Sequence, residues 1–399
     1  MRFALFGFGV IAIIGALVIL QLQFLNRNWW NVKLIRRLVW VVIVMAFLGW
    51  TILGIGMYLS SNIAIAIGAI CGSLMLVTLV ALIISLPFSG ILNTIANRLK
   101  KRDRAYDGAV SAGRPVSRRT FLHRTAAVFP MAALGAGSGG FAASFSNVKV
   151  FELPLYYSDL PPQLDGFRIL HLSDLHLGRY FQLTDLENVL TDAEQFRPDL
   201  VLLTGDICDV PKQLPETLRM ISASKPRAGC AASIGNHEYY HGLKLSLDVH
   251  AHSDVPLFIN NGFTLDIDGA GLYLCGADDP ARLFADIDDF LGDTVRRSLD
   301  GAPFDAFKII MSHRPRGFVM AADLGTELTL SGHTHGGQIA FRGKSMFETT
   351  DPPNFYWGHY RRGGSQLYTS SGVGHWFPFR LGCPAEAPVI VLRNSEQLT

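Results

Sequence analysis

The chain has 399 residues, a formal net charge of +2 and 17% charged residues, below the roughly 25% that is usual for soluble domains. The charge is unevenly placed, because residues 1–148 hold 14 Lys and Arg against 2 Asp and Glu, whereas residues 149–399 hold 21 against 31. Eleven of the 12 histidines follow residue 150. This distribution excludes an ordinary cytosolic enzyme and a disordered or repeat protein, and it predicts a membrane half followed by a half that holds the chemically active residues.

Three long uncharged segments predict four membrane spans, because a bilayer core of about 30 Å needs about 20 apolar residues in a helix. Residues 3–26 supply one span, and residues 38–97 are long enough for two, with a hinge near Ser60. Residues 125–148 form a weaker, Ala- and Gly-rich span that we expect Pro130 to break. A buried core helix is the alternative for each segment, and it applies best to the last one.

The positions of Lys and Arg predict the orientation, because these residues accumulate in loops on the cytoplasmic side. Residues 27–37 hold four basic residues and no acid, residues 98–124 hold nine basic residues, and the turn near Ser60 holds none. Both basic segments are therefore expected inside. Four spans then place the N-terminus and residues 149–399 outside, on the periplasmic or extracellular face of the cytoplasmic membrane.

Residues 117–122, Ser-Arg-Arg-Thr-Phe-Leu, resemble the twin-arginine export signal, and a mildly apolar stretch follows them. The alternative is an ordinary basic flank of a membrane span. A real signal would make the twin-arginine translocase a partner during export, and cleavage near Ala142 stays open. We divide the chain into a membrane region with three spans at 1–97, a basic segment with the fourth span at 98–148, and one domain at 149–399.

The domain at 149–399 is predicted to be α/β. It contains five short apolar runs that each end in a polar cluster, and runs of this length are typical of buried strands. Amphipathic stretches at 183–196 and 215–224 lie between them, which gives a β-α-β rhythm. Because ligands bind at the carboxyl ends of strands in such sheets, we expect the polar clusters to meet. The five runs are residues 167–176, 199–209, 228–238, 307–315 and 327–337.

The polar clusters combine carboxylates, imidazoles and one amide. Each has an ordinary alternative, since Asp174 could cap a helix, Asn236 could lie in a turn, and a lone strand-end histidine such as His313 is more often structural. Together they form an oxygen and nitrogen donor set that suits Mn, Fe or Zn, and a carboxylate such as Asp206 can bridge two cations about 4 Å apart. The clusters comprise Asp174, His176, Asp206, Asn236, His237, His313, His333 and His335.

The motifs D-x-H, G-D-x-x-D, G-N-H-E, an isolated His and G-H-x-H follow one another in this order, and they resemble the calcineurin-like metallophosphoesterase family over about residues 165–393. The resemblance implies two packed sheets flanked by helices and two divalent metal ions. It makes His237 a catalytic residue that faces the scissile phosphate and helps the leaving oxygen, supported by Glu238. It assigns one metal ion to Asp174, His176, Asp206 and His335, and the other to Asp206, Asn236, His313 and His333.

Other features narrow the branch that the chain resembles. Val210-Pro211 follows G-D-x-x-D, where the serine/threonine protein phosphatases have Arg-Gly. Asp278-Asp279 and residues 332–338 and 380–386 look like a membrane-associated or twin-arginine-exported bacterial branch, sometimes described by similarity as UDP-2,3-diacylglucosamine hydrolases of lipid A synthesis. That substrate conflicts with an outer-face domain, because nucleotide-activated sugars are made in the cytoplasm.

Three further features have two interpretations each. We expect Asp209 to orient a metal ligand, and the alternative is an ordinary loop acid. An outside location permits disulfides, but Cys208, Cys230 and Cys275 fall in predicted strands, which favours free buried cysteines. The segment 354–364 is aromatic and basic, so it could form a lid or lipid-facing rim whose two arginines meet phosphate, or a surface loop with packed aromatic rings.

The sequence thus predicts a membrane-anchored, dinuclear metal-dependent phosphodiesterase or pyrophosphatase. The resemblance implies attack by a metal-activated hydroxide, and the anchor favours an envelope or lipid-linked phosphate ester because it holds the site near the bilayer. We expect no nucleic acid partner. A membrane sensor that only binds phosphate is the alternative, but it would be favoured by a lost ligand or a missing His237, and neither occurs. A transporter is disfavoured because the spans lack charged residues.

Overall fold

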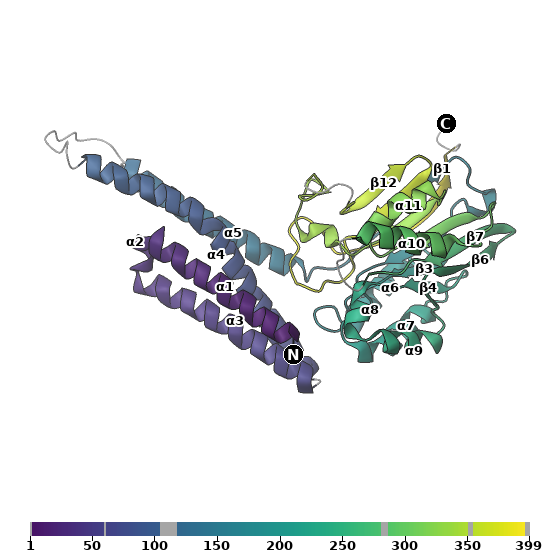
Figure 1. Ribbon diagram of the computed structural model, residues 1–399, viewed down its shortest axis with the longest axis horizontal. Helices are drawn as coiled ribbons and strands as arrows, with labels where there is room; N and C mark the ends of the chain where they lie inside the picture. Colours follow the sequence, from purple (N-terminus) through teal and green to yellow (C-terminus); the bar gives the residue numbers. More distant parts are fainter. Residues whose placement is uncertain (1, 60, 104–117, 281–285, 350–353, 396–399) are drawn as a thin grey trace. The chain divides into compact units, whose positions relative to one another are not determined.

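Two compact units make up the chain. The helical unit comprises Met1–Ala143 and Phe377–Phe379, and the α/β unit comprises Ser144–Trp376 and Arg380–Thr399. The α/β unit begins at Ser144, five residues before the domain start at residue 149 that the sequence suggests. The computed structural model describes all residues except 1, 60, 104–117, 281–285, 350–353 and 396–399 (Figure 1).

The helical unit contains, among its described residues, four helices that are long and apolar enough to cross a membrane. The uncharged segment 38–97 forms the two helices that its length predicts. Most of the following basic loop, including Ser117 of the twin-arginine-like motif, lies outside the described residues. The four helices are α1 (Arg2–Phe24), α3 (Lys33–Leu59), α4 (Asn62–Asp103) and α5 (Arg118–Ala143), and the short α2 (Arg27–Trp30) lies between the first two.

Glycines allow α3 and α4 to pack closely. A Cβ atom added to Gly49 would overlap the backbone of Gly72, and one added to Gly68 would overlap the backbone of Leu53. Small residues at such contacts are typical of helices that associate within a bilayer. Helix α4 has 42 residues and is therefore about 63 Å long at 1.5 Å per residue, so it extends beyond a bilayer core of about 30 Å.

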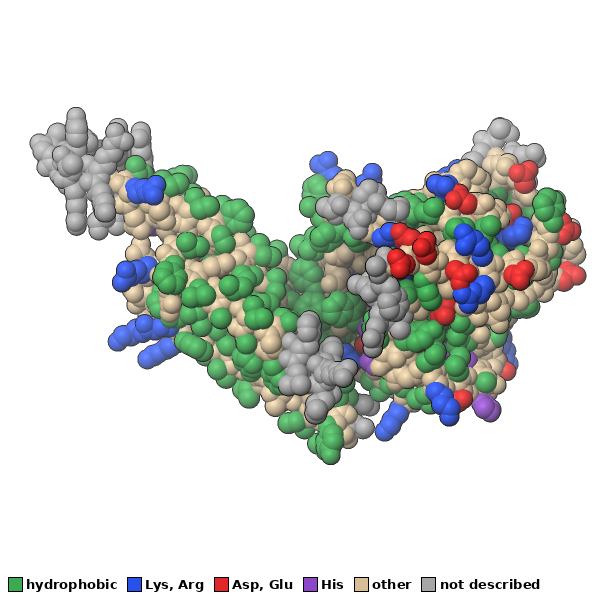
Figure 2. Space-filling model, in the orientation of Figure 1, with side chains coloured by type: hydrophobic (Ala, Val, Ile, Leu, Met, Phe, Trp, Pro, Cys, Tyr) green, Lys and Arg blue, Asp and Glu red, His purple; other side chains and the backbone are tan. Residues whose placement is uncertain are grey.

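Pro130, expected from the sequence to break the fourth span, lies inside α5 instead, and the helix continues to Ala143. The prediction of a break is wrong because a proline removes only one backbone donor, and transmembrane helices tolerate this when neighbouring groups satisfy the freed carbonyl. Pro87 lies inside α4 in the same way. Figure 2 shows a largely hydrophobic and uncharged surface on the helical unit, with Lys and Arg gathered toward one end of it.

Strands form the centre of the α/β unit. In chain order they are β1 (Lys149–Tyr157), β2 (Arg168–Leu172), β3 (Leu200–Thr204), β4 (Cys230–Ser233), β5 (Leu257–Phe258), β6 (Asn261–Ile267), β7 (Ala270–Gly276), β8 (Phe307–Met311), β9 (Leu328–Ser331), β10 (Ala340–Phe341), β11 (Lys344–Ser345), β12 (Gly358–Arg362), β13 (Ser365–Thr369) and β14 (Glu386–Asn394). They form two six-stranded sheets, ordered β1-β14-β2-β3-β4-β5 and β12-β13-β9-β8-β7-β6, and a separate β10-β11 hairpin. Strands β2 to β5 run parallel, as do β13, β9, β8 and β7, so each set ends at one edge of its sheet.

The two sheets pack face to face and helices cover their outer faces, which confirms the predicted fold class (Figure 1). Leu202 of β3 shares a buried cluster with Ile309 of β8. The next residues along these strands point the opposite way, so Leu203 packs toward α6 and α7, and Ile310 packs toward α10 and α11. The helices are α6 (Leu183–Glu194), α7 (Leu214–Ala223), α8 (Asn236–His241), α9 (Leu243–Ala251), α10 (Ile287–Leu299) and α11 (Phe318–Asp323).

Candidate metal centre

The site lies where strands of both sheets end. Asp174 and His176 follow β2, Asp206 follows β3, and Asn236 begins α8 after β4. In the second sheet His313 follows β8, and residues 333–335 follow β9. The five predicted strands therefore deliver their polar clusters to one region, because their carboxyl ends lie at the facing edges of the two sheets.

Backbone strain marks the same residues. Asp174, His176, Asp206, His333 and His335 have φ between 44° and 67°, a left-handed conformation that non-glycine residues rarely adopt. Such strain costs of the order of 1–3 kcal/mol per residue and persists where the surrounding structure enforces it, most often at functional sites. These five residues lie in the three loops that follow β2, β3 and β9, at the ends of the strands.

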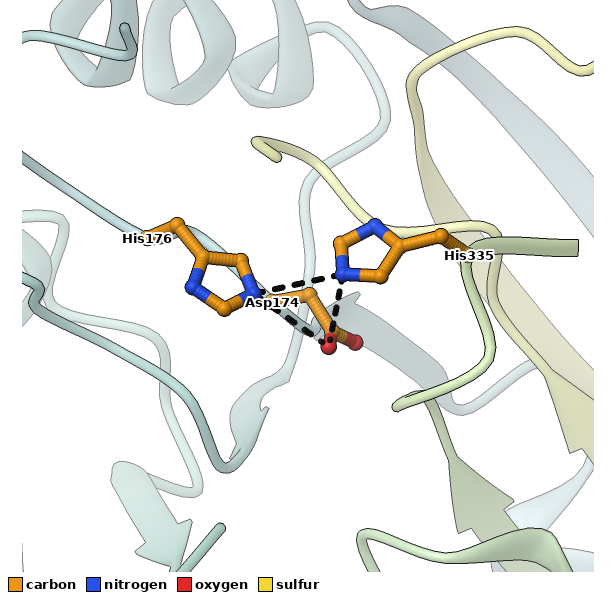
Figure 3. A group of neighbouring side chains, drawn as sticks. All are labelled: Asp174, His176 and His335. Carbon is orange, nitrogen blue, oxygen red and sulfur yellow. Dashed lines mark hydrogen bonds and ion pairs between the residues drawn. The ribbon is translucent and has the colours of Figure 1, made fainter. Parts of the chain in front are cut away.

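The first group of possible ligands comprises Asp174 and His176 from the loop after β2 and His335 from the loop after β9, and the three side chains point toward one another (Figure 3). The Nε2 atoms of the two histidines are 3.2 Å apart. The Oδ1 atom of Asp174 lies 3.4 Å from His335 Nε2 and 3.8 Å from His176 Nε2. All three side chains are buried, so the donor atoms face one enclosed point.

The second group comprises Asp206, His313 and His333. His313 Nε2 lies 3.3 Å from Asp206 Oδ2 and 3.3 Å from His333 Nδ1. The same Asp206 Oδ2 atom is 3.6 Å from His176 Nε2 of the first group. One carboxylate oxygen therefore lies between the two groups. Asn236 lines the same cavity of about 460 Å³, and its buried Oδ1 atom has no hydrogen-bond partner within the described part of the chain.

The hydrogen bonds of two histidines fit a metal site. His313 Nδ1 donates to the Thr204 carbonyl oxygen at 2.7 Å, and His176 Nδ1 donates to Asp209 Oδ1 at 3.1 Å. In the neutral form that binds a metal ion, each ring carries its lone pair on Nε2, the nitrogen that faces a carboxylate oxygen. In that form the lone pairs on the nitrogen and the oxygen repel each other unless a positive charge lies between them. The residues present therefore fit a bound cation, and the oxygen and nitrogen donors suit Mn, Fe or Zn.

The electrostatics of the buried acids lead to the same conclusion. Burial opposes protonation of His176 and His313, yet the neighbouring carboxylates outweigh it and raise the pKa of each to about 10. Asp209 acts most strongly on His176, and Asp206 on His313. Burial also opposes ionisation of Asp206, but His313 and His237 hold its pKa well below the usual range. The buried carboxylates thus favour nearby positive charge, which protons on His176 and His313 or bound divalent cations would supply.

His333 has a different environment, because Arg314 contacts its outer nitrogen. Arg314 Nη1 donates to His333 Nε2 at 2.6 Å, and Arg314 Nε lies 3.0 Å from Asp279 Oδ2. With Nε2 accepting, the ring proton lies on Nδ1, which faces His313. A neutral ring that bound a cation through Nδ1 would carry its proton on Nε2 and could not accept from Arg314, so the Arg314 and Asp279 contacts would have to change at this ligand position. The motifs did not indicate Arg314, although it follows His313 directly.

Asp209 is the centre of a second layer of contacts. Its Oδ1 atom accepts from His176 Nδ1 at 3.1 Å and from His237 Nδ1 at 2.7 Å, and it lies 3.4 Å from His241 Nε2. Its Oδ2 atom is 3.8 Å from Arg179 Nε. The structure therefore gives Asp209 the contacts expected of a residue that orients a ligand. His241 was not among the candidate residues, although its i+4 spacing from His237 on one helix is a usable signal.

His237 and Glu238 are adjacent in sequence but lie in different surroundings. His237 lines the cavity, and its Nε2 atom is 3.9 Å from Asp206 Oδ2. The buried Glu238 carboxylate accepts from the backbone N–H groups of Gly235, Asp206 and Ile207 at 2.8 to 3.0 Å. Glu238 therefore fixes the backbone of the Asp206 loop and the start of α8, rather than contacting the cavity.

Arg361 and Arg362 of the segment 354–364 do not reach phosphate at this site. Arg361 and Arg362 lie on β12, where Arg362 pairs with Ser365 at the start of β13. The end of β13 that lies at the site is the opposite one, where Thr369 pairs with Ser331. Arg362 forms an ion pair with Asp323. The interpretation that these arginines meet phosphate is thus wrong, because they lie toward the end of the strand pair that is remote from the site. The five cysteines are free, as the sequence favours.

Arg380, from the motif at 380–386, supports the wall of the site. Its buried guanidinium donates to the carbonyl oxygens of Ser371, Pro384, Gly372 and Gly374 at 2.7 to 3.0 Å. In the loop that Arg380 contacts, Gly374 N donates to the carbonyl oxygen of Asp174, a candidate ligand. The buried Arg380 guanidinium therefore connects two loops to the backbone of the first ligand group.

We expect Arg380→Met to lower the free energy of unfolding by about 3 kcal/mol or more, because four buried carbonyl oxygens lose a charged donor. For a unit of this size that corresponds to a melting temperature about 6–12 °C lower. The measurement is thermal unfolding of the full chain in detergent. The matched control is Arg219→Met, since Arg219 is exposed and pairs with Glu216 across one helical turn, so its effect should be within measurement error. Equal melting temperatures for both variants would contradict the structural role of Arg380.

Removal of metal ions should lower stability. The cluster of buried carboxylates gains favourable charge interactions from cations that bind only the folded chain, and a ligand at 100 times its Kd adds about 2.7 kcal/mol. We expect the chelated protein to melt about 5–10 °C below the protein with Mn or Zn restored. Ca, which prefers all-oxygen sites, is the control and should restore less. A melting temperature that no transition metal raises would contradict the presence of a metal site.

Comparison with known proteins agrees with the motifs and the geometry. A calcineurin-like phosphoesterase family model matches residues 167–337. An uncharacterized metallophosphoesterase of Campylobacter jejuni is 31% identical over 267 residues, 64% of this chain and 67% of that protein, and one of Bacillus subtilis is 30% identical over 293 residues, 70% of this chain and 99% of that protein. A transmembrane protein with metallophosphoesterase domain from Danio rerio is 27% identical over 323 residues, 77% of this chain and 69% of that protein. The chain therefore belongs to the calcineurin-like metallophosphoesterase family.

Proposed function

We propose that the protein is a membrane-anchored phosphodiesterase or pyrophosphatase that uses two divalent cations, Mn, Fe or Zn. The position of Asp206 carries the proposal: its Oδ2 atom is 3.3 Å from His313 Nε2 and 3.6 Å from His176 Nε2, so it can serve both ligand groups. One cation would be held by Asp174, His176, Asp206 and His335, and the other by Asp206, Asn236, His313 and His333.

The protein's own residues have distinct roles in this proposal. When bound, two cations activate water as a nucleophile and neutralise charge that develops on the phosphoryl oxygens. His237 donates to Asp209 through Nδ1, which leaves Nε2 toward the cavity to hold or deliver a proton at the leaving oxygen. Asp209 and Glu238 are positioning residues, the first for two imidazoles and the second for the Asp206 loop.

The proposed substrate is an envelope or lipid-linked phosphate ester on the outer face of the cytoplasmic membrane. Helix α5 ends at Ala143 and β1 begins at Lys149, so a short linker follows the last candidate span. The positive-inside pattern supports the outer placement, and the motif at 117–122 supports the twin-arginine translocase as the export partner. UDP-2,3-diacylglucosamine hydrolysis becomes the better candidate only if the domain lies in the cytoplasm.

The activity is tested with the full chain in detergent, stripped of metal and then supplied with Mn, Fe or Zn. We expect hydrolysis of bis-p-nitrophenyl phosphate that depends on metal and exceeds hydrolysis of the monoester p-nitrophenyl phosphate. A clear preference for the monoester would contradict the diesterase assignment. Bound metal without turnover of either ester would favour a phosphate-binding sensor.

The orientation is tested separately by fusing reporters after Thr399. Alkaline phosphatase, which folds in oxidising compartments, should be active there, and a cytoplasmic fluorescent reporter should be dark. The opposite pattern would overturn the outer placement while leaving the chemistry of the site unaffected.

A further inference from the structure

An exposed apolar surface borders the metal centre. After His335 the chain forms the β10-β11 hairpin, which leaves Phe341 65% and Met346 56% exposed. Nearby Trp376 is 49% exposed and Leu381 is 36% exposed. Together with Phe347, these side chains are called the apolar rim. Soluble surfaces rarely expose several large apolar residues together without an interaction to serve.

Backbone hydrogen bonds connect the rim to the metal loop. Leu381 N donates to Gln338 O at 2.8 Å, and Ala340 N donates to Leu381 O at 2.8 Å. Gln338 and Trp376 also line the metal cavity. Phe347 packs against Gly337, where a Cβ atom would overlap its ring. The rim is therefore continuous with the cavity wall.

The positive charge of the hairpin indicates the kind of partner that the rim would contact. Arg342 and Lys344 are exposed at its tip, and the Arg342 guanidinium lies 5.3 Å from the Phe341 ring. Residues 336–347 contain no Asp or Glu. Exposed aromatic residues beside Lys and Arg are typical of segments that lie at a membrane interface, where the basic groups meet lipid phosphates.

We propose that the apolar rim contacts the acyl chain of a lipid whose phosphate ester enters the metal cavity. The inference rests on the proposed function and names its substrate class. The chain keeps the start of β1 close to the end of the candidate span α5, because residues 144–148 link the two and span at most about 18 Å. A lipid fits better than a protein partner, since the rim joins apolar side chains, basic groups and the phosphate site in one surface.

The test compares two diesters with the same scissile bond and leaving group, p-nitrophenyl dodecyl phosphate and p-nitrophenyl methyl phosphate. Both are assayed with the full metal-loaded chain in non-ionic detergent. We expect kcat/KM to be at least about tenfold higher for the dodecyl ester, mainly through KM, because several methylenes leave water at the rim. In the double variant F341S/M346S the ratio should fall to near one.

The matched control is Phe304→Ser. Phe304 is 99% exposed and precedes β8, at the edge of the sheet opposite the metal centre, so this variant should keep the wild-type ratio. A wild-type ratio near one, with the methyl ester hydrolysed, would overturn the rim inference and leave the diesterase standing. If F341S/M346S kept the wild-type ratio of kcat/KM for the two esters, the rim inference would also be overturned. Failure to hydrolyse either ester with any metal would instead overturn the proposed function.

Discussion

Asp206→Asn should abolish most turnover. The carboxylate lies between both ligand groups, and an amide keeps its shape while removing the charge that can hold two cations. Mutations of residues that only orient a ligand cost about 10- to 100-fold, so we expect a loss above 100-fold in kcat for bis-p-nitrophenyl phosphate. Metal content, measured by mass spectrometry, should fall from two ions to one or fewer per chain.

The control for this substitution is Asp248→Asn on α9. Asp248 is exposed and its side chain lies 4.0 Å from Lys244, so turnover should stay within about twofold of the wild type. Circular dichroism confirms that both variants are folded. An Asp206→Asn protein that keeps two ions and a tenth of the turnover would show that Asp206 does not bridge the site.

His237→Ala should lower kcat by about 10²- to 10⁴-fold, the usual contribution of a positioned acid or base, without changing metal content. Because the proposed role is proton delivery to the leaving oxygen, the loss should be larger for diphenyl phosphate than for bis-p-nitrophenyl phosphate. Phenolate is the poorer leaving group and needs the proton more.

His241→Ala is the matched control, one turn along α8. His241 also approaches Asp209, at 3.4 Å against 2.7 Å for His237, but it is not among the described residues that line the cavity. The loss of kcat in His241→Ala should be tenfold or less and independent of the leaving group. Equal losses for both variants would assign the effect to Asp209, and a leaving-group-independent loss for His237→Ala would contradict proton delivery.

The sequence predicted the site-bearing strands well because buried parallel strands leave a strong local pattern. The run ending in Asp174 and His176 is a short apolar segment followed by polar residues, and β2 occupies it. The same logic located β3, β4, β8 and β9. The long edge pair of β1 and β14 was not predicted. Strand β1 is half exposed and contains Pro154, and its partner follows more than 200 residues later, so no local pattern marks the pairing.

The site contacts that escaped prediction depend on tertiary structure. Arg314 is an ordinary basic residue in sequence, and only the second sheet brings Asp279 from the end of β7 and His333 from the end of β9 to its guanidinium. Glu238 had a usable local signal, since a Glu three residues after Gly235 is typical of a helix start. The motif resemblance favoured a catalytic role, whereas its backbone contacts indicate positioning.

A metal titration tests the central claim most directly. The full chain, stripped with a chelator, is titrated with Mn or Zn while bound metal per chain and bis-p-nitrophenyl phosphate turnover are measured in the same samples. The two ligand groups joined by Asp206 predict two bound ions and a turnover that approaches its maximum only as the second ion binds. Full turnover of the stripped protein, or two bound ions with no turnover of any phosphodiester, would contradict a dinuclear phosphodiesterase.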